Sequence, residues 1–417
     1  MHARLSHNIS WMLVSRLAAH GFAVLFNVLL ARRLGSAGFG EYASLGVILL
    51  IANALTTFGT DMLLIREVAV SGISARLQAA LKLQLALSAA SIALIWMFGR
   101  LLPGLSAEGL LALRIYSLAL IPLAFFTVFT TALRGRERMG AFMLLNLALA
   151  AGQMTVFMLP HTELVPLAIL LLVIQVGGAL LAGVLCSLRL PQFWLRWRRG
   201  SASILSLLHD TAPLAGLAVL TILYQRLNVL MLLAMAGPVS TGLYSAAARV
   251  VEPFRLLQAA AFTALYPVMA QEAALRTGAE PRLTSRYVRL LLAAALAAAF
   301  ALAVLAAPLV RLLYGVGYAA SGGVAGLLAW SLIPFTANTY LSLHLLASRR
   351  EPTAACALML ALLSLLAIGL WRIPIEGARG AAWAVLGAEA LQSILLLISL
   401  RGGIPLGGRA RELPQSP

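Results

Sequence analysis

Long apolar runs, separated by short polar segments, set the pattern of this chain. Each run has about twenty residues or more, the length that a helix needs to cross the hydrocarbon core of a bilayer. The runs are rich in Leu and Ala and lack the alternation of apolar and polar positions that marks a membrane barrel strand. We therefore predict an all-α membrane protein with about twelve transmembrane helices, at residues 8–33, 40–65, 79–102, 110–133, 139–160, 164–188, 206–236, 240–270, 287–313, 321–347, 353–372 and 379–400.

Arginine is unevenly distributed among the segments that join these runs. Three arginines lie between residues 134 and 138, and four lie between residues 189 and 199. The turns at 160–163 and 237–241 contain neither Lys nor Arg. Because cytoplasmic loops are enriched in these residues, the alternation predicts that both termini are cytoplasmic. Five arginines depart from it: Arg32, Arg33, Arg100, Arg372 and Arg379.

Composition supports a membrane protein and excludes several other classes. The chain has 417 residues, of which 61% are hydrophobic and 11% charged, whereas soluble domains have about 25% charged residues. The formal net charge of +17 comes almost entirely from arginine, and we assign it to cytoplasmic loops rather than to nucleic-acid binding. Cys186 and Cys356 fall inside apolar runs, which argues against a disulfide framework or a zinc site. Arg16 interrupts the first run, so we expect a retained helix rather than a signal peptide.

The two halves of the chain resemble each other. Gly35, Gly40 and Tyr42 recur at the same spacing as Gly237, Gly242 and Tyr244. Ile121-Pro122 followed by Arg136-Glu137 recurs as Ile333-Pro334 followed by Arg350-Glu351. Two matches in the same order favour a duplicated six-helix unit. We predict an N-terminal lobe at residues 1–200 and a C-terminal lobe with a short cytoplasmic tail at 201–417, related as a parallel repeat.

Ionisable residues inside the spans are the candidate functional residues, because each costs about 2.5–3.5 kcal/mol to insert. Arg16, His20 and Asn27 share one face of the first helix. Arg226 lies in the seventh span, and Arg249, Glu252 and Arg255 follow at intervals of three in the eighth. Local neutralisation of Arg249 or Arg255 by Glu252 is an alternative role for these charges. The acidic candidates within the spans are fewer: Asp61, Glu252 and Glu389.

This excess of arginine suggests an anionic substrate, since guanidinium groups bind phosphate oxygens through paired hydrogen bonds. Pro122, Pro213, Pro253 and Pro334 interrupt helical hydrogen bonding, so kinks are expected there. We find no phosphate-binding glycine loop, no metal-spaced His/Cys cluster and no hydrolase motif, and therefore predict no enzyme activity, cofactor or metal.

Several short motifs resemble those of a known family. The turn from Leu34 to Tyr42, with Phe58-Gly59 and Arg66-Glu67 after it, resembles the start of polysaccharide-export flippases of the multidrug/oligosaccharidyl-lipid/polysaccharide (MOP) superfamily. The segment 307–322 resembles the exit from their ninth span. The segment 244–254 is similar to a motif of lipid II flippases, in which the arginine matching Arg249 faces a central cavity. Glu252 and Ser15-Arg16 also match residues of those proteins.

The resemblance implies two six-helix lobes around a cation-lined cavity, and substrates that are isoprenoid diphosphates carrying an oligosaccharide. We expect a flippase for an O-antigen or another surface polysaccharide unit, in a bacterial inner membrane. Arg16, His20, Asn27, Arg226, Arg249 and Arg255 are the predicted substrate-binding residues. Asp61, Glu252 and Glu389 are candidates for ion coupling.

The expected partners are the lipid-linked oligosaccharide, membrane lipids and the polysaccharide polymerase machinery, with no nucleic acid. Three alternatives stay open: a lipid II flippase, a drug or cation antiporter of the same superfamily, and, in a different class, a membrane-embedded polymerase. Lipid II flippases usually have fourteen spans. An antiporter for cations should have an acidic cavity, and a polymerase normally carries a large periplasmic loop.

Overall fold

The computed structural model describes residues 2–72, 76–158, 163–190, 193, 203–274, 282–348 and 350–401. Some of these residues are described by their backbone alone: 2–20, 71, 270, 272–274, 282–285 and 401. The helices of the first half are α1 (His2–Thr57), α2 (Thr60–Ser71), α3 (Arg76–Phe98), α4 (Ala107–Ser117), α5 (Leu120–Gly135), α6 (Met139–Gln153) and α7 (Leu164–Arg189). They are followed by α9 (Ile204–Ala274), α10 (Arg282–Tyr314), α11 (Ala319–Ala329), α12 (Leu332–Ala347), α13 (Glu351–Glu376) and α14 (Ala378–Arg401). Short 3-10 helices lie at Gly99–Leu101 (η1), Met154–Met158 (η2) and Val316–Tyr318 (η3).

The apolar helices account for the predicted number of membrane spans. In the described residues, nine helices are long and apolar enough to cross a membrane, or ten if the bent pair α11 and α12 counts as one span. Two of these, in α1 and α9, contain a glycine with non-helical backbone angles partway along. Dividing each at its glycine gives twelve spans in the predicted order. The predicted all-α membrane fold is confirmed.

The first two spans of each half are joined by a single residue rather than by a loop. Gly35 has φ 66° and ψ 179° within α1, and Gly237 has φ 77° and ψ 178° within α9. This backbone region is open essentially to glycine alone. The two glycines are the first residues of the sequence repeat, so the repeat encodes the same junction twice.

The second repeated motif also produces matching local structure. Helices α4 and α11 have 11 residues each, and the helices that follow them, α5 and α12, have 16 each. Pro122 and Pro334 are both the third residue after the break. Because this position needs no helical hydrogen bond to its nitrogen, proline is tolerated there. The duplicated architecture is therefore confirmed in backbone geometry as well as in sequence.

Helix breaks precede two of the four prolines, Pro122 and Pro334, and the α11–α12 pair is bent by 40°. Pro213 and Pro253 lie within α9, which continues through both. An unpredicted break occurs at Phe58–Gly59, where both residues have positive φ and α1 gives way to α2. The break places Asp61 in the first turn of α2, so Asp61 does not continue the helical face of Asn53 and Thr57 in α1. At this position the negative charge of its carboxylate is stabilised by the positive end of the helix dipole.

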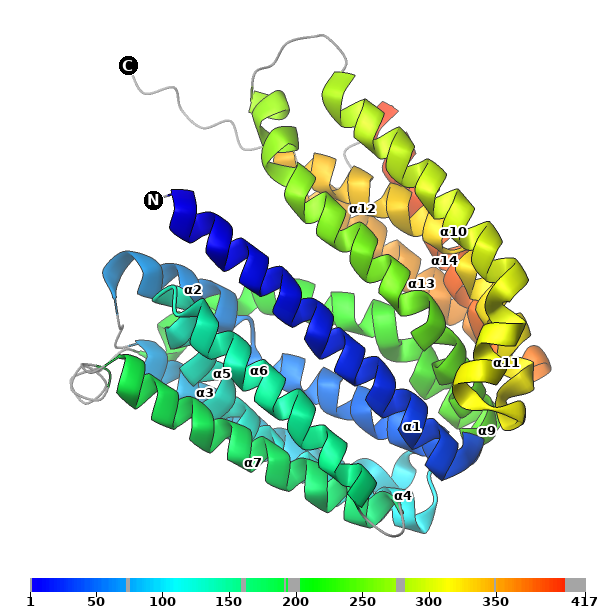
Figure 1. Ribbon diagram of the computed structural model, residues 1–417, viewed down its shortest axis with the longest axis horizontal. Coiled ribbons are helices and arrows are strands. Elements are labelled where there is room, and N and C mark those ends of the chain that lie inside the picture. The colour runs from blue at the N-terminus through cyan, green and yellow to red at the C-terminus, as the bar shows by residue number, and fades with distance from the viewer. Residues whose placement is uncertain are drawn as a thin grey trace. The chain divides into compact units, whose positions relative to one another are not determined.

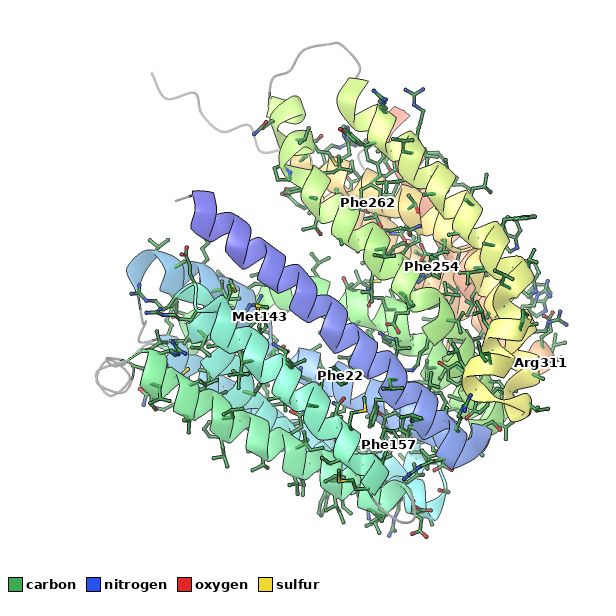
Figure 2. All side chains as sticks on the ribbon, in the orientation of Figure 1. Phe22, Met143, Phe157, Phe254, Phe262 and Arg311 are labelled. Carbon is green, nitrogen blue, oxygen red and sulfur yellow. The ribbon has the colours of Figure 1, made fainter. Side chains whose placement is uncertain are left out.

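The chain divides into two compact units, Met1–Ile222 and Leu223–Pro417. The boundary predicted at residue 200 lies outside the described residues. In the first unit α5 packs on α2, α3 and α7, and α1 lies alongside α6 (Figure 1). Phe157, labelled in Figure 2, packs with its ring centroid 5.6 Å from that of Phe26 of α1. In the second unit α14 packs on α11, α12 and α13, while α10 packs on α11 and α12 (Figure 1).

The first turns of α9 belong to the first unit. A Cβ at Gly59 would lie 2.9 Å from the Ala215 backbone nitrogen, so the α1–α2 break approaches α9 closely. Arg76 at the start of α3 binds Glu67 of α2 at 2.7 Å and Asp210 of α9 at 2.9 Å. These contacts hold Ile204–Ile222 against the first unit, while the rest of the same helix builds the second.

Candidate functional site

Five of the predicted site residues lie in the second unit. Arg226 is on the arm of α9 before Gly237, and Arg249, Glu252 and Arg255 are on the arm after it. Glu389 is on α14. Residues three apart on a helix are neighbours on its surface, so the second arm presents its three charged side chains as one stripe. With the uncharged residues that bind them, these five side chains form what we call the α9 cluster.

Glu252 binds across the glycine junction rather than along its own helix. Its Oε1 accepts a hydrogen bond from Nη2 of Arg226 at 3.0 Å. The sequence leaves open that Glu252 neutralises Arg249 or Arg255 on its own helix. In the structure, Glu252 instead accepts its hydrogen bond from Arg226. The amide of Asn228 also crosses the junction and donates a hydrogen bond to the Tyr244 hydroxyl. The two arms of α9 are thus joined by one ion pair and one neutral hydrogen bond.

Arg255 reaches towards three other helical segments. Its Nη2 donates a hydrogen bond to Oγ of Ser331 at 2.7 Å, in the break between α11 and α12. The same nitrogen lies 3.6 Å from Oε1 of Glu389. The guanidinium carbon is 4.9 Å from the centre of the Phe335 ring, within cation–π range. A break in one span therefore supplies both a hydroxyl and an aromatic face for an arginine of another.

Glu389 is held firmly on its other side. Its side chain is only 3% exposed. Asn338 of α12 donates to Glu389 Oε2 at 2.7 Å and to the Glu389 backbone carbonyl at 2.9 Å. Ser393 in turn donates to Oδ1 of Asn338 at 2.7 Å. Tyr224 is near enough to Glu389 to interact with it, but its hydroxyl lacks the geometry of a hydrogen bond with any described residue.

Arg249 completes the stripe. Together with Glu252 it lies close enough to Tyr314, at the end of α10, to interact with the phenol electrostatically. The α9 cluster thus contains three guanidinium groups and two carboxylates, a net formal charge of +1. Its arginines remain partly open, since the side chains of Arg226 and Arg255 are 37% and 27% exposed. The buried Nε of Arg226 donates to no described residue, so this group retains hydrogen-bonding capacity.

The remaining predicted residues belong to the first unit. Asn27 is buried in α1, donates to the Ala23 carbonyl at 2.6 Å, and leaves its Oδ1 without a hydrogen bond to any described residue. Asp61 is half-buried at the start of α2. The side chains of Arg16 and His20 lie outside those described. Asn27 and Asn228, which precede the two junction glycines, are both buried.

Sequence reasoning missed Ser331, Phe335 and Asn338. All three flank Pro334, and Asn338 is a polar residue within an otherwise apolar span, which was a usable signal. The hydrogen-bond partners of Asn338 and Ser331 lie 51 and 76 positions away along the chain, and helical periodicity carries no information about such distant pairs. Among the described residues, no group of three or more His, Cys, Asp or Glu side chains could hold a metal ion. What the cluster offers is guanidinium donors suited to an anion.

Comparisons with known proteins place this geometry in context. The family model described as polysaccharide biosynthesis protein matches residues 5–272. A structure of the lipid II flippase MurJ in an inward closed conformation superposes with a TM-score of 0.75 at 14% identity, covering 94% of this chain and 87% of that one. An inward-facing multidrug resistance transporter of the MATE family gives 0.72 at 15% identity, covering 93% and 97%. A MOP superfamily transporter from Pyrococcus furiosus gives 0.64 at 15% identity, covering 94% and 92%. No curated protein matches by sequence.

Proposed function

Since the chain belongs to the polysaccharide biosynthesis protein family of the MOP superfamily, we propose that it is a flippase for an isoprenoid-diphosphate-linked oligosaccharide. The substrate would be an O-antigen or another surface polysaccharide unit. Its transfer would run from the cytoplasmic to the periplasmic leaflet of a bacterial inner membrane by alternating access. The lipid-linked oligosaccharide and the surrounding lipids are then the partners, and the polymerase that uses the product is a further one.

The observation that carries this proposal is the convergence of Arg226, Arg249 and Arg255 in one membrane-embedded cluster. Charged residues at this depth are expensive and normally serve a function. A diphosphate offers several oxygen acceptors, and guanidinium groups bind such oxygens through two parallel hydrogen bonds while keeping their charge at any working pH. The diphosphate would bind these three arginines. Arg16, of the first unit, stays a predicted substrate-binding residue. His20 and Asn27 are proposed to contact the sugar.

The rival functions differ in the charge of the cargo. Lipid II is also an isoprenoid diphosphate, and the likeness to MurJ keeps lipid II flipping as the nearest alternative. A cationic drug is a poorer match to a cluster with net positive charge. The described residues form helices and short connections, with no enzyme-like domain among them, so a polymerase is the least supported.

Translocation in proteoliposomes tests the proposal directly. A fluorescent isoprenoid-diphosphate oligosaccharide would be incorporated in the liposomes, and its accessibility to a membrane-impermeant quencher followed over time. We expect wild-type protein to flip it, and Arg249→Ala and Arg16→Ala to slow flipping by about tenfold or more, as for the loss of a charge-assisted contact worth about 1.5–3 kcal/mol. Lipid II in a parallel set of vesicles separates the two flippase alternatives.

Arg311→Ala is the matched control. Arg311 lies near the end of α10 (Figure 2), is exposed, and is outside the α9 cluster. It should flip at the wild-type rate. Flipping that ignores Arg249 and Arg16 would retain a transporter but remove the proposed site. Folded protein that flips no lipid-linked sugar would overturn the proposal.

A further inference from the structure

We propose that Glu389 is an internal counter-anion for Arg255: it occupies the guanidinium when no substrate is bound, and the substrate diphosphate displaces it. This inference rests on the proposed function, because it assigns Arg255 to the diphosphate. Glu389 is then a positioning residue, which acts on the substrate through Arg255 and promotes release of the substrate.

The carboxylate is the fixed member of this pair. Asn338 donates to both its side chain and its backbone, and Ser393 fixes Asn338 in turn. The Glu389 side chain is almost fully buried. If Arg255 turned away, Glu389 would keep its hydrogen bond from Asn338 and would not need to move.

Arg255 is the mobile member. Its 3.6 Å separation from Glu389 is longer than the roughly 2.7–2.9 Å of a charge-assisted hydrogen bond, so the attraction between them is largely electrostatic. Its short hydrogen bond is to a neutral hydroxyl, that of Ser331. The long side chain is also partly exposed. A diphosphate that offers two acceptors in the plane of the guanidinium would therefore replace a weaker set of contacts.

The groups facing Glu389 are few. Arg255 of α9 is the charged side chain that interacts with it, and Tyr224 of α9 and Asn338 of α12 are its neutral polar neighbours. The cluster has a second arginine–carboxylate pair, Arg226 and Glu252, which is a direct hydrogen bond of 3.0 Å and is more exposed. The two carboxylates offset two of the three guanidinium charges, so the cluster has a net formal charge of +1 without any bound anion. Each carboxylate would therefore compete with the substrate for its arginine.

The test compares binding with transport. Purified wild-type protein and Glu389→Gln would be titrated with farnesyl diphosphate, a soluble isoprenoid diphosphate, and the same proteins assayed for flipping in proteoliposomes. Gln is isosteric and still accepts a hydrogen bond from Asn338. We expect the Kd of Glu389→Gln for farnesyl diphosphate to fall roughly tenfold, as for the removal of a competing ligand. The maximal flipping rate should also fall, because release of the substrate is slower.

Glu389→Asp serves as the second variant and guards against misfolding of the first. It keeps the charge but withdraws the carboxylate by one methylene, so its Kd should lie between those of wild type and Glu389→Gln. Thermal melting of each variant establishes that it is folded. A merely structural role for Glu389 would weaken binding and transport together.

The outcomes separate this inference from the proposed function. If Arg255→Ala weakens binding but folded Glu389→Gln and Glu389→Asp bind no more tightly than wild type, the counter-anion role is wrong and the flippase proposal stands. If Arg255→Ala and Arg249→Ala both bind farnesyl diphosphate as wild type does, the anion site itself is wrong and the inference falls with it.

Discussion

Among single residues, the glycines at the two junctions carry the most specific structural requirement. Gly35 and Gly237 adopt nearly the same φ and ψ, in a region that other residues enter only with strain. At neither position would a Cβ meet another atom within 4 Å. The requirement is therefore for backbone conformation and not for space, and it arises where two spans are joined without a loop.

Gly237→Ala should reduce stability by about 1–3 kcal/mol, the cost of a strained backbone residue. Gly216→Ala is the control, because Gly216 lies in the helical part of the same α9, where an added Cβ would have no atom within 4 Å. There alanine should be neutral or slightly stabilising. Thermal melting in detergent measures both. Equal melting temperatures for the two variants would contradict this interpretation of the junction.

Among the elements, the broken span formed by α11 and α12 supplies several contacts to the α9 cluster. The break between α11 and α12 presents Ser331 and Phe335 to Arg255, and α12 then carries Asn338 to Glu389. The continuous helix α9 supplies the arginines. Proline has a different consequence at the start of a helix and in the interior of a continuous helix, because only in the interior does it remove a hydrogen bond that would otherwise form.

Pro253→Ala should therefore stabilise the protein more than Pro334→Ala. Pro253 lies inside α9, where an N–H could pair with the Arg249 carbonyl, and proline in such a position costs about 3 kcal/mol. Pro334 lies in the first turn of α12, where no such bond is lost. Melting temperatures of the two variants provide the comparison. A larger gain from Pro334→Ala would show that the break in that span is strained.

The hydrophobic pattern is enough to predict the helices but not the contacts between them. Lipid requires every spanning segment to satisfy its own backbone, so apolar runs translate into helices with little influence from distant residues. The pairing of Arg226 with Glu252 and of Arg255 with Glu389 depends on packing between segments, which the local sequence does not reveal. The break at Phe58–Gly59 escaped prediction for a related reason, since it occurs where the backbone of α9 comes close.

For the whole molecule, the distribution of arginine predicts the orientation in the membrane. Positive charge favours the cytoplasmic side, which places the α5–α6 connection inside and the α9 junction outside. Cys186 is buried and Cys356 half-buried, and both lie inside spans, so the native protein should react poorly with a membrane-impermeant thiol reagent.

Single cysteines test this orientation. In intact spheroplasts an impermeant maleimide should label Val239→Cys, whose side chain is exposed beside the α9 junction. It should label Arg136→Cys, exposed between α5 and α6, only after the membrane is permeabilised. Unmodified protein is the background control. The opposite labelling pattern would reverse the predicted orientation and, with it, the proposed direction of transport.

The sharing of α9 between the two units bears on how this chain can be divided into fragments. A chain cut just before Ser203 would leave Ile204–Ile222 covalently attached to the second half, although these turns pack within the first. The first fragment would lack the helical turns that pack on it, and the second would carry those turns without the surface that they cover. The two fragments should therefore require co-expression and should reassociate through Ile204–Ile222.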